Sequence, residues 1–101
     1  QLTEFPSVIL DLENLKELYL GDNFITAIPI DIDLLKNLEW LGLWSNLLRR
    51  FPSSLSDMPE LSTLDILYND MTFSEQTWLL ELLPHIDVEM SEPCHCTFDD
   101  E

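Results

Sequence analysis

The end of the sequence holds the residues whose side chains are best suited to binding a metal ion. Cys94, His95 and Cys96 stand together there, and His85 could supply a fourth ligand. Structural zinc sites space paired cysteines by two to four residues and use a second pair, whereas one residue separates these cysteines and the sequence holds no others. Cysteines this close also bridge each other poorly. The sequence therefore predicts no metal site, no cofactor and two free thiols.

The remaining polar residues give little support for catalysis. A nucleophile needs a base within hydrogen-bonding reach, and His85 has no serine or cysteine obviously paired with it. Asp65, Asp87 and Glu89 lack the spacing of a calcium-binding loop, and carboxylates on a solvated surface have no burial to shift their pKa values. We therefore expect a chain that is not an enzyme.

Aromatic and acidic side chains form the third chemical group, and they suit contact with another protein. Exposed tryptophan and tyrosine often dominate the binding energy of protein interfaces. The candidate partner-binding residues are Tyr19, Asp22, Trp40, Trp44, Asp65, Leu67, Tyr68 and His85. The alternative is that Trp44 packs on Leu67 and contributes only to stability. These residues can act together only if the fold brings them to one face.

The charge of the chain narrows the kind of partner. Its 101 residues carry 20 acidic and 4 basic side chains, a net charge of −16. Such a surface repels phosphate backbones and anionic lipid, so we expect no nucleic acid partner. No apolar run is long enough for membrane insertion. Basic protein surfaces would be steered towards the chain, unless the charge serves only to keep an apolar array soluble.

One phrase occurs three times and sets where those residues lie. It has the pattern L-x-x-L-x-L-x-x-N, and its copies cover residues 15–23, 38–46 and 61–69. The copies start 23 residues apart, and proline recurs in the same frame at Pro6, Pro29 and Pro52. A fixed period of this size predicts a stacked array of repeats rather than a single globular core.

Each phrase predicts a short strand followed by a return segment. The inner apolar residues alternate with outward ones, which is the two-residue period of a strand with one buried face. Strands that run in the same direction form a parallel sheet. The prolines make a long helix unfavourable in the first returns. In the third return, Thr72 and Glu75 form a capping-box pattern ahead of good helix formers, which predicts a helix over residues 74–83.

These patterns divide the chain into repeats. We expect a repeat domain over residues 1–91 and an acidic, cysteine-containing tail over residues 92–101. The domain consists of a half repeat at 1–14, repeats at 15–37, 38–60 and 61–82, and a degenerate terminal strand at 83–91. The phrase of that last strand begins one residue early, at Leu83. Because residues 1–14 supply only a return, the strand near Leu18 would expose an edge that could pair with another chain.

The sequence resembles leucine-rich repeat proteins across about residues 2–91. Its 23-residue unit is similar to their typical subtype, which occurs in bacterial arrays and intracellular scaffold proteins. The resemblance implies an α/β fold: a right-handed solenoid with a short parallel sheet on the concave face, and turns, 3-10 segments and one terminal helix on the convex face. It also implies that Asn23, Asn46 and Asn69 form a structural ladder that pairs the backbone of each turn.

The expected function is a non-catalytic protein–protein interaction module that binds a partner with a basic surface through the concave aromatic and acidic face. The alternative is a structural or self-assembling part of a longer repeat array. The cellular location stays open. The lack of an N-x-S/T sequon favours a bacterial or intracellular chain, whereas Cys94 and Cys96 resemble the start of the cysteine-rich cap of extracellular leucine-rich repeat proteins.

Overall fold

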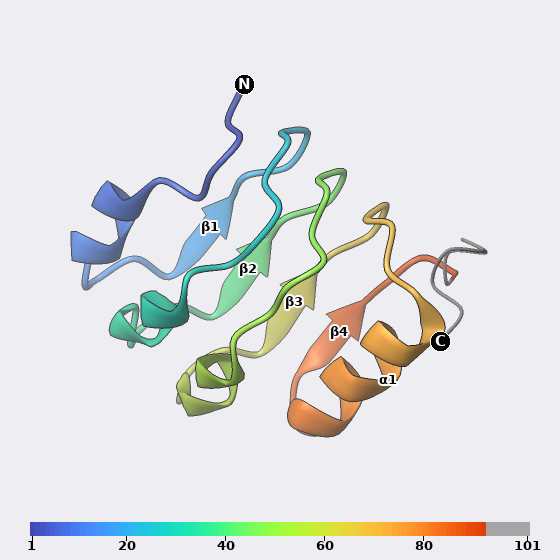
Figure 1. The fold of residues 1–101 in the computed structure, drawn as a ribbon. Coiled ribbons are helices and arrows are strands. Elements are labelled where there is room, and N and C mark those ends of the chain that lie inside the picture. The colour runs from blue at the N-terminus through green and yellow to red at the C-terminus, as the bar shows by residue number, and fades with distance from the viewer. Residues whose placement is uncertain (93–101) are drawn as a thin grey trace.

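The fold alternates between short strands and return segments, and the computed structural model describes residues 1–92 of it (Figure 1). The strands are β1 (Glu17–Tyr19), β2 (Trp40–Gly42), β3 (Thr63–Asp65) and β4 (Asp87–Glu89). The returns are the 3-10 helices η1 (Ser7–Asp11), η2 (Ile30–Leu34) and η3 (Ser53–Asp57), and the α-helix α1 (Phe73–Leu82). The strands form one parallel sheet in the order β1-β2-β3-β4. This confirms the expected α/β repeat solenoid.

Proline explains why the first three returns are short. Pro6, Pro29 and Pro52 stand directly before η1, η2 and η3 with extended backbone angles. Proline has a fixed φ and no N–H, so it is tolerated at a helix start and stops the helix from extending backwards. In the last return Glu75 takes the place of the proline, and the longer helix α1 forms there.

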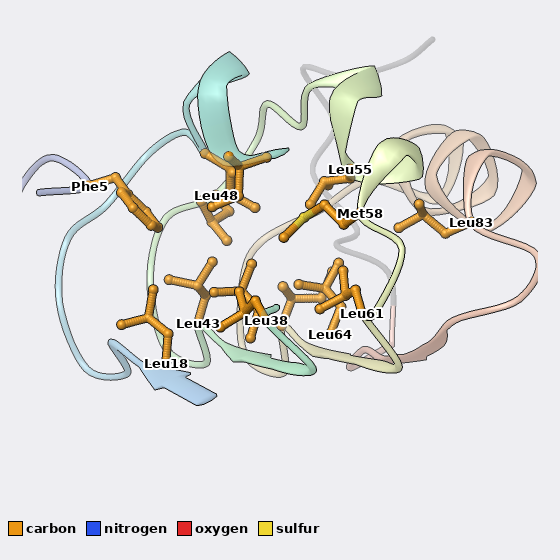
Figure 2. Close-up of a cluster of buried hydrophobic side chains, with 14 of the residues drawn as sticks. Phe5, Leu18, Leu38, Leu43, Leu48, Leu55, Met58, Leu61, Leu64 and Leu83 are labelled. Carbon is orange, nitrogen blue, oxygen red and sulfur yellow. The ribbon is translucent and has the colours of Figure 1, made fainter. Parts of the chain in front are cut away.

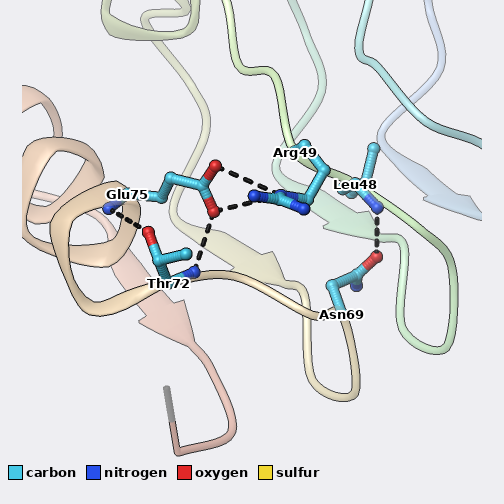
Figure 3. Close-up of polar contacts among 5 residues, drawn as sticks. All are labelled: Leu48, Arg49, Asn69, Thr72 and Glu75. Carbon is cyan, nitrogen blue, oxygen red and sulfur yellow. Dashed lines mark hydrogen bonds and ion pairs between the residues drawn. The ribbon is translucent and has the colours of Figure 1, made fainter. Parts of the chain in front are cut away.

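A capping box starts α1 where the sequence predicts one. The Thr72 hydroxyl accepts a hydrogen bond from the Glu75 N–H at 3.2 Å, and the Thr72 N–H donates to the Glu75 carboxylate at 2.8 Å (Figure 3). These two bonds satisfy backbone donors that a helix start otherwise leaves unpaired. The helix expected over residues 74–83 is therefore present, one residue earlier at each end.

The register of the sheet follows the repeat until the last strand. Leu18, Leu41 and Leu64 are partners across β1, β2 and β3, 23 residues apart. The fourth strand pairs Leu64 with Val88, which is 24 residues further on. The expectation that the last phrase begins one residue early, at Leu83, is therefore wrong, and the strand comes one residue late. The ten-residue α1 replaces a five-residue 3-10 helix, which changes the length of the return.

A continuous row of apolar side chains fills the space between the sheet and the returns (Figure 2). The large side chains that are fully buried are Ile25, Ile32, Leu35, Leu38, Leu41, Leu43, Leu48, Leu55, Leu64, Ile66, Met71 and Leu79. The first repeat is less well covered, because Ile9, Leu10 and Leu15 are only partly buried. Within residues 1–92 this repeat has a neighbouring repeat on one side alone, which leaves these side chains less covered.

Asn46 ties its own turn to the preceding repeat. Its Nδ2 donates to the carbonyls of Leu43 and Trp44, at 3.2 Å each. The same nitrogen donates to the Leu20 carbonyl of the first repeat at 3.0 Å. Its Oδ1 accepts from the Ile25 N–H at 2.9 Å. One buried side chain therefore pairs backbone groups of two neighbouring repeats.

The equivalent asparagines make equivalent bonds. Asn69 accepts from the Leu48 N–H at 2.8 Å (Figure 3) and donates to the Leu43 carbonyl at 3.0 Å. Asn23 accepts from the Leu2 N–H at 2.8 Å. Buried backbone groups need partners, and these bonds supply them at one-repeat intervals.

Replacing Asn46 should therefore cost far more than replacing an exposed asparagine. Asn46→Ala leaves several buried backbone groups unpaired, so we expect the free energy of unfolding to fall by about 3 kcal/mol. The matched control is Asn37→Ala, because Asn37 makes one exposed bond to the Glu13 carbonyl and should cost less than about 1 kcal/mol. Urea denaturation followed by circular dichroism measures both. Equal losses in the two variants would contradict this role for Asn46.

Candidate protein-binding face

Three aromatic side chains gather on the outward face of the sheet. Tyr19 of β1 lies with its ring centroid 6.3 Å from that of Trp40 in β2 and 6.1 Å from that of Trp44, which follows β2. The rings are tilted by 47° and 55°, and both centroid distances fall in the range at which aromatic side chains attract each other. Tyr19 is 50% exposed, and both tryptophans are half-buried. Tyr19, Trp40 and Trp44 are called the aromatic cluster below.

The indole of Trp44 lies across the two glycines of the chain. A Cβ atom added to Gly21 would overlap the indole ring, and one added to Gly42 would stand 2.6 Å from the Trp44 ring and 3.0 Å from the Tyr19 ring. No other residue type fits under the ring without moving it. Trp44 itself therefore occupies the space that the absent side chains of the two glycines leave.

The polar atoms of the aromatic cluster have unequal surroundings. The Tyr19 hydroxyl donates to the Glu17 carboxylate at 2.9 Å, and this bond raises the pKa of Tyr19. The indole nitrogen of Trp40 is buried and has no hydrogen-bond partner within the part of the chain that the structure describes. An unpaired buried donor costs free energy. Because no hydrogen bond within residues 1–92 fixes this nitrogen, packing against neighbouring side chains holds the ring of Trp40 in place.

Carboxylates border the aromatic cluster on the side of the last strand. Asp65 of β3 is the register partner of Glu89 in β4, and Asp87 lies two residues before Glu89. Repulsion from Asp87 is the largest cause that raises the pKa of Glu89. Asp65 also accepts a hydrogen bond from the Leu67 N–H at 3.2 Å. These like charges have no basic residue among them in the strands.

The turn that leaves each of the first three strands holds one residue in the left-handed backbone region. Asp22, Ser45 and Tyr68 occupy equivalent positions with φ of 59°, 53° and 61°. Aspartate visits this region readily, whereas it is uncommon for a bulky residue such as tyrosine. The side chain of Tyr68 is 68% exposed, so burial does not offset the conformational cost. Its N–H donates to the Ser91 hydroxyl at 2.8 Å.

The sequence predicts Leu67 and His85 on this face. Leu67 is half-buried, and its carbonyl accepts a hydrogen bond at 2.8 Å from the N–H of Ser45, the residue after Trp44. His85 lies in the turn between α1 and β4, two residues before the strand begins, where it lines a hollow with Ser56 and Pro59 of the return layer. The structure therefore does not bring His85 into the aromatic cluster.

The remaining expectations from the sequence concern a metal site and membrane insertion. Cys94, His95 and Cys96 lie outside the described residues. Within residues 1–92, no group of three or more histidine, cysteine, aspartate or glutamate side chains could hold a metal ion. Over the same range, no helix has the length and apolar character needed to cross a bilayer.

Sequence reasoning missed one feature of the return layer. Arg49, Arg50, Phe51 and Trp78 line a hollow beside the start of α1. The sequence feature that indicates this hollow is the break in the 23-residue period at Ser74 and Glu75. At these two positions the earlier repeats have phenylalanine or isoleucine, followed by proline.

Comparison with known proteins gives curated relatives and a solved structure, and no family model matches the chain. The chain is 37% identical over 75 residues to an adenylate cyclase of Schizosaccharomyces pombe, covering 73% of this chain. It is 33% identical over 88 residues to an adenylate cyclase of Neurospora crassa, covering 86% of this chain. In each case the match spans 4% of the relative's length.

The structural comparison is more informative, because it compares the fold itself. A leucine-rich repeat protein of Leptospira interrogans superposes with a TM-score of 0.80 and 32% sequence identity. The match covers 86% of this chain and 22% of that protein. The parallel strands and short returns of this chain are those that the phrase at residues 15–23 and its copies predict. The chain therefore has the leucine-rich repeat fold.

Proposed function

We propose that this chain is a non-catalytic module that binds another protein through the aromatic cluster and the residues around it. The observation that carries the proposal is the arrangement of Trp44 over Gly21 and Gly42, beside the half-exposed Tyr19. Interface hot spots are enriched in tryptophan and tyrosine. A ring already fixed by packing loses little conformational entropy when a partner covers it.

The border of the aromatic cluster favours a partner with a basic surface. Asp65 lies beside Gly42 in the sheet and opposite Glu89, and repulsion from Asp87 and Asp65 contributes to the raised pKa of Glu89. A lysine or arginine of a partner would relieve that repulsion. Charge complementarity of this kind speeds association and excludes acidic partners. The expected interface therefore has an aromatic centre and an acidic rim.

Removing the two tryptophans should weaken binding strongly and leave the fold intact. Binders would be selected from a displayed protein-domain library with the 101-residue chain, and their affinities measured by calorimetry. We expect the double variant Trp40→Ala/Trp44→Ala to bind at least about 30-fold more weakly. The control is Phe73→Ala, since Phe73 is 70% exposed at the start of α1.

A second variant separates the position of the ring from its presence. Gly21→Ala keeps Trp44 in the sequence but forces its indole off the sheet, so we expect a similar loss of affinity. Selected binders that hold the double variant and Gly21→Ala as tightly as the wild type would contradict the proposal.

Replacing Tyr68 in its strained turn should raise stability and weaken binding. Asparagine tolerates the left-handed region better than tyrosine, so we expect Tyr68→Asn to raise the free energy of unfolding by about 1 kcal/mol. The same change removes an exposed ring beside the face and should weaken binding. Chemical denaturation and calorimetry measure the two effects. A variant that is more stable and binds unchanged would exclude Tyr68 from the interface.

Self-assembly is the second candidate, and the open edge of the sheet favours it. β1 pairs with β2, and no other strand within residues 1–92 lies along its remaining edge. Unpaired strand edges are sites for pairing with another chain. If this candidate holds, sedimentation analysis will show a dimer that forms as the concentration of the chain rises. A monomer throughout the micromolar range would remove it.

A further inference from the structure

A hollow of about 380 Å³ opens where the periodicity of the returns breaks. Phe51 and Pro52 lead into η3, whereas Ser74 and Glu75 hold the equivalent positions at the start of α1. The backbones of η2 and η3 lie close together, whereas those of η3 and α1 do not. The hollow, called the arginine hollow below, is lined by Arg49, Arg50, Phe51, Ser74, Glu75 and Trp78.

The arginine hollow contains both arginines of a chain that has 4 basic residues. Arg49 is fixed, because its Nε donates to the two carboxylate oxygens of Glu75 at 3.1 and 3.3 Å (Figure 3). Glu75 in turn is held by the capping box of α1. Arg50 is exposed and takes part in no ion pair within residues 1–92. Because Arg49 is already paired, Arg50 is the guanidinium group of this hollow that a ligand can reach.

Apolar surface lies beside these charges. Trp78 of α1 is 46% exposed, and Phe51 is half-buried. A guanidinium group recognises a carboxylate through directed N–H bonds, and an exposed indole gains free energy when it is covered. A ligand that carries both a carboxylate and an apolar side chain satisfies both requirements, whereas a basic ligand would face an uncompensated Arg50.

We propose that the arginine hollow binds an acidic peptide segment of another protein, with an aspartate or glutamate carboxylate on Arg50 and an apolar side chain against Phe51 and Trp78. The net charge of −16 does not prevent this, because the Debye length at physiological ionic strength is about 8 Å and screens the more distant carboxylates. The site lies in the return layer. It is independent of the function proposed for the aromatic cluster.

The test is an NMR titration of the isotopically labelled 101-residue chain with two short peptides. The acidic probe is acetyl-Asp-Phe-Asp-amide, and its uncharged counterpart is acetyl-Asn-Phe-Asn-amide. We expect the acidic probe to shift the indole N–H signal of Trp78 with a dissociation constant on the order of 1 mM, and to leave that of Trp44 in place. Arg50→Gln should weaken the acidic probe about fivefold, and added salt should weaken it further.

Matched variants decide between the outcomes. Lys36→Gln removes one positive charge elsewhere and should bind the acidic probe like the wild type. Trp40→Ala/Trp44→Ala should also bind it normally, which separates this site from the aromatic cluster. The proposal is overturned if both peptides shift Trp78 equally, or if Arg50→Gln binds the acidic probe unchanged. It is also overturned if the Trp78 signal shifts with chain concentration alone, because a second copy would then be the occupant.

Discussion

The turn that leaves each strand must pair its backbone polar groups inside the protein, and the rest of the fold depends on this requirement. Asn46 meets it by bonding to its own turn and to the turn of the preceding repeat at once. Asn69 does the same one repeat later. Because each asparagine spans two repeats, it fixes the distance and the register between neighbouring strands as well as the turn.

That register also sets the positions of the aromatic rings on the outward face of the sheet. With β1 and β2 locked 23 residues apart, Gly42 lies opposite Tyr19, and the indole of Trp44 extends over both glycines. The rigid turn thus determines where the ring lies. A surface prepared in this way has less ordering left to do on binding than a flexible loop would have. The same geometry leaves Tyr68 in a strained conformation at the edge of that surface.

Most of the fold follows from the sequence because its causes are local and periodic. The spacing of Asn23, Asn46 and Asn69 predicts the strands, the prolines predict the short returns, and Thr72 with Glu75 predicts the helix. The outward placement of Tyr19, Trp40 and Asp65 follows from strand alternation. Alternation fails for His85, because it applies only within a strand and His85 precedes one.

The features that the sequence could not supply arise where two repeats of different geometry meet. The 24-residue step to β4 depends on how far α1 carries the chain, which a 23-residue frame does not contain. The arginine hollow depends on the gap between η3 and α1, and its residues come from two separate segments.

The most direct test of the central claim is a cross-saturation NMR experiment on the labelled chain with a bound protein partner. Saturation passes from the partner to the atoms in contact with it. The account predicts the strongest effects at the indole and ring signals of Tyr19, Trp40 and Trp44, with weaker effects around them on the outward face of the sheet. Saturation confined to η2, η3 and α1, with none at the three rings, would contradict it.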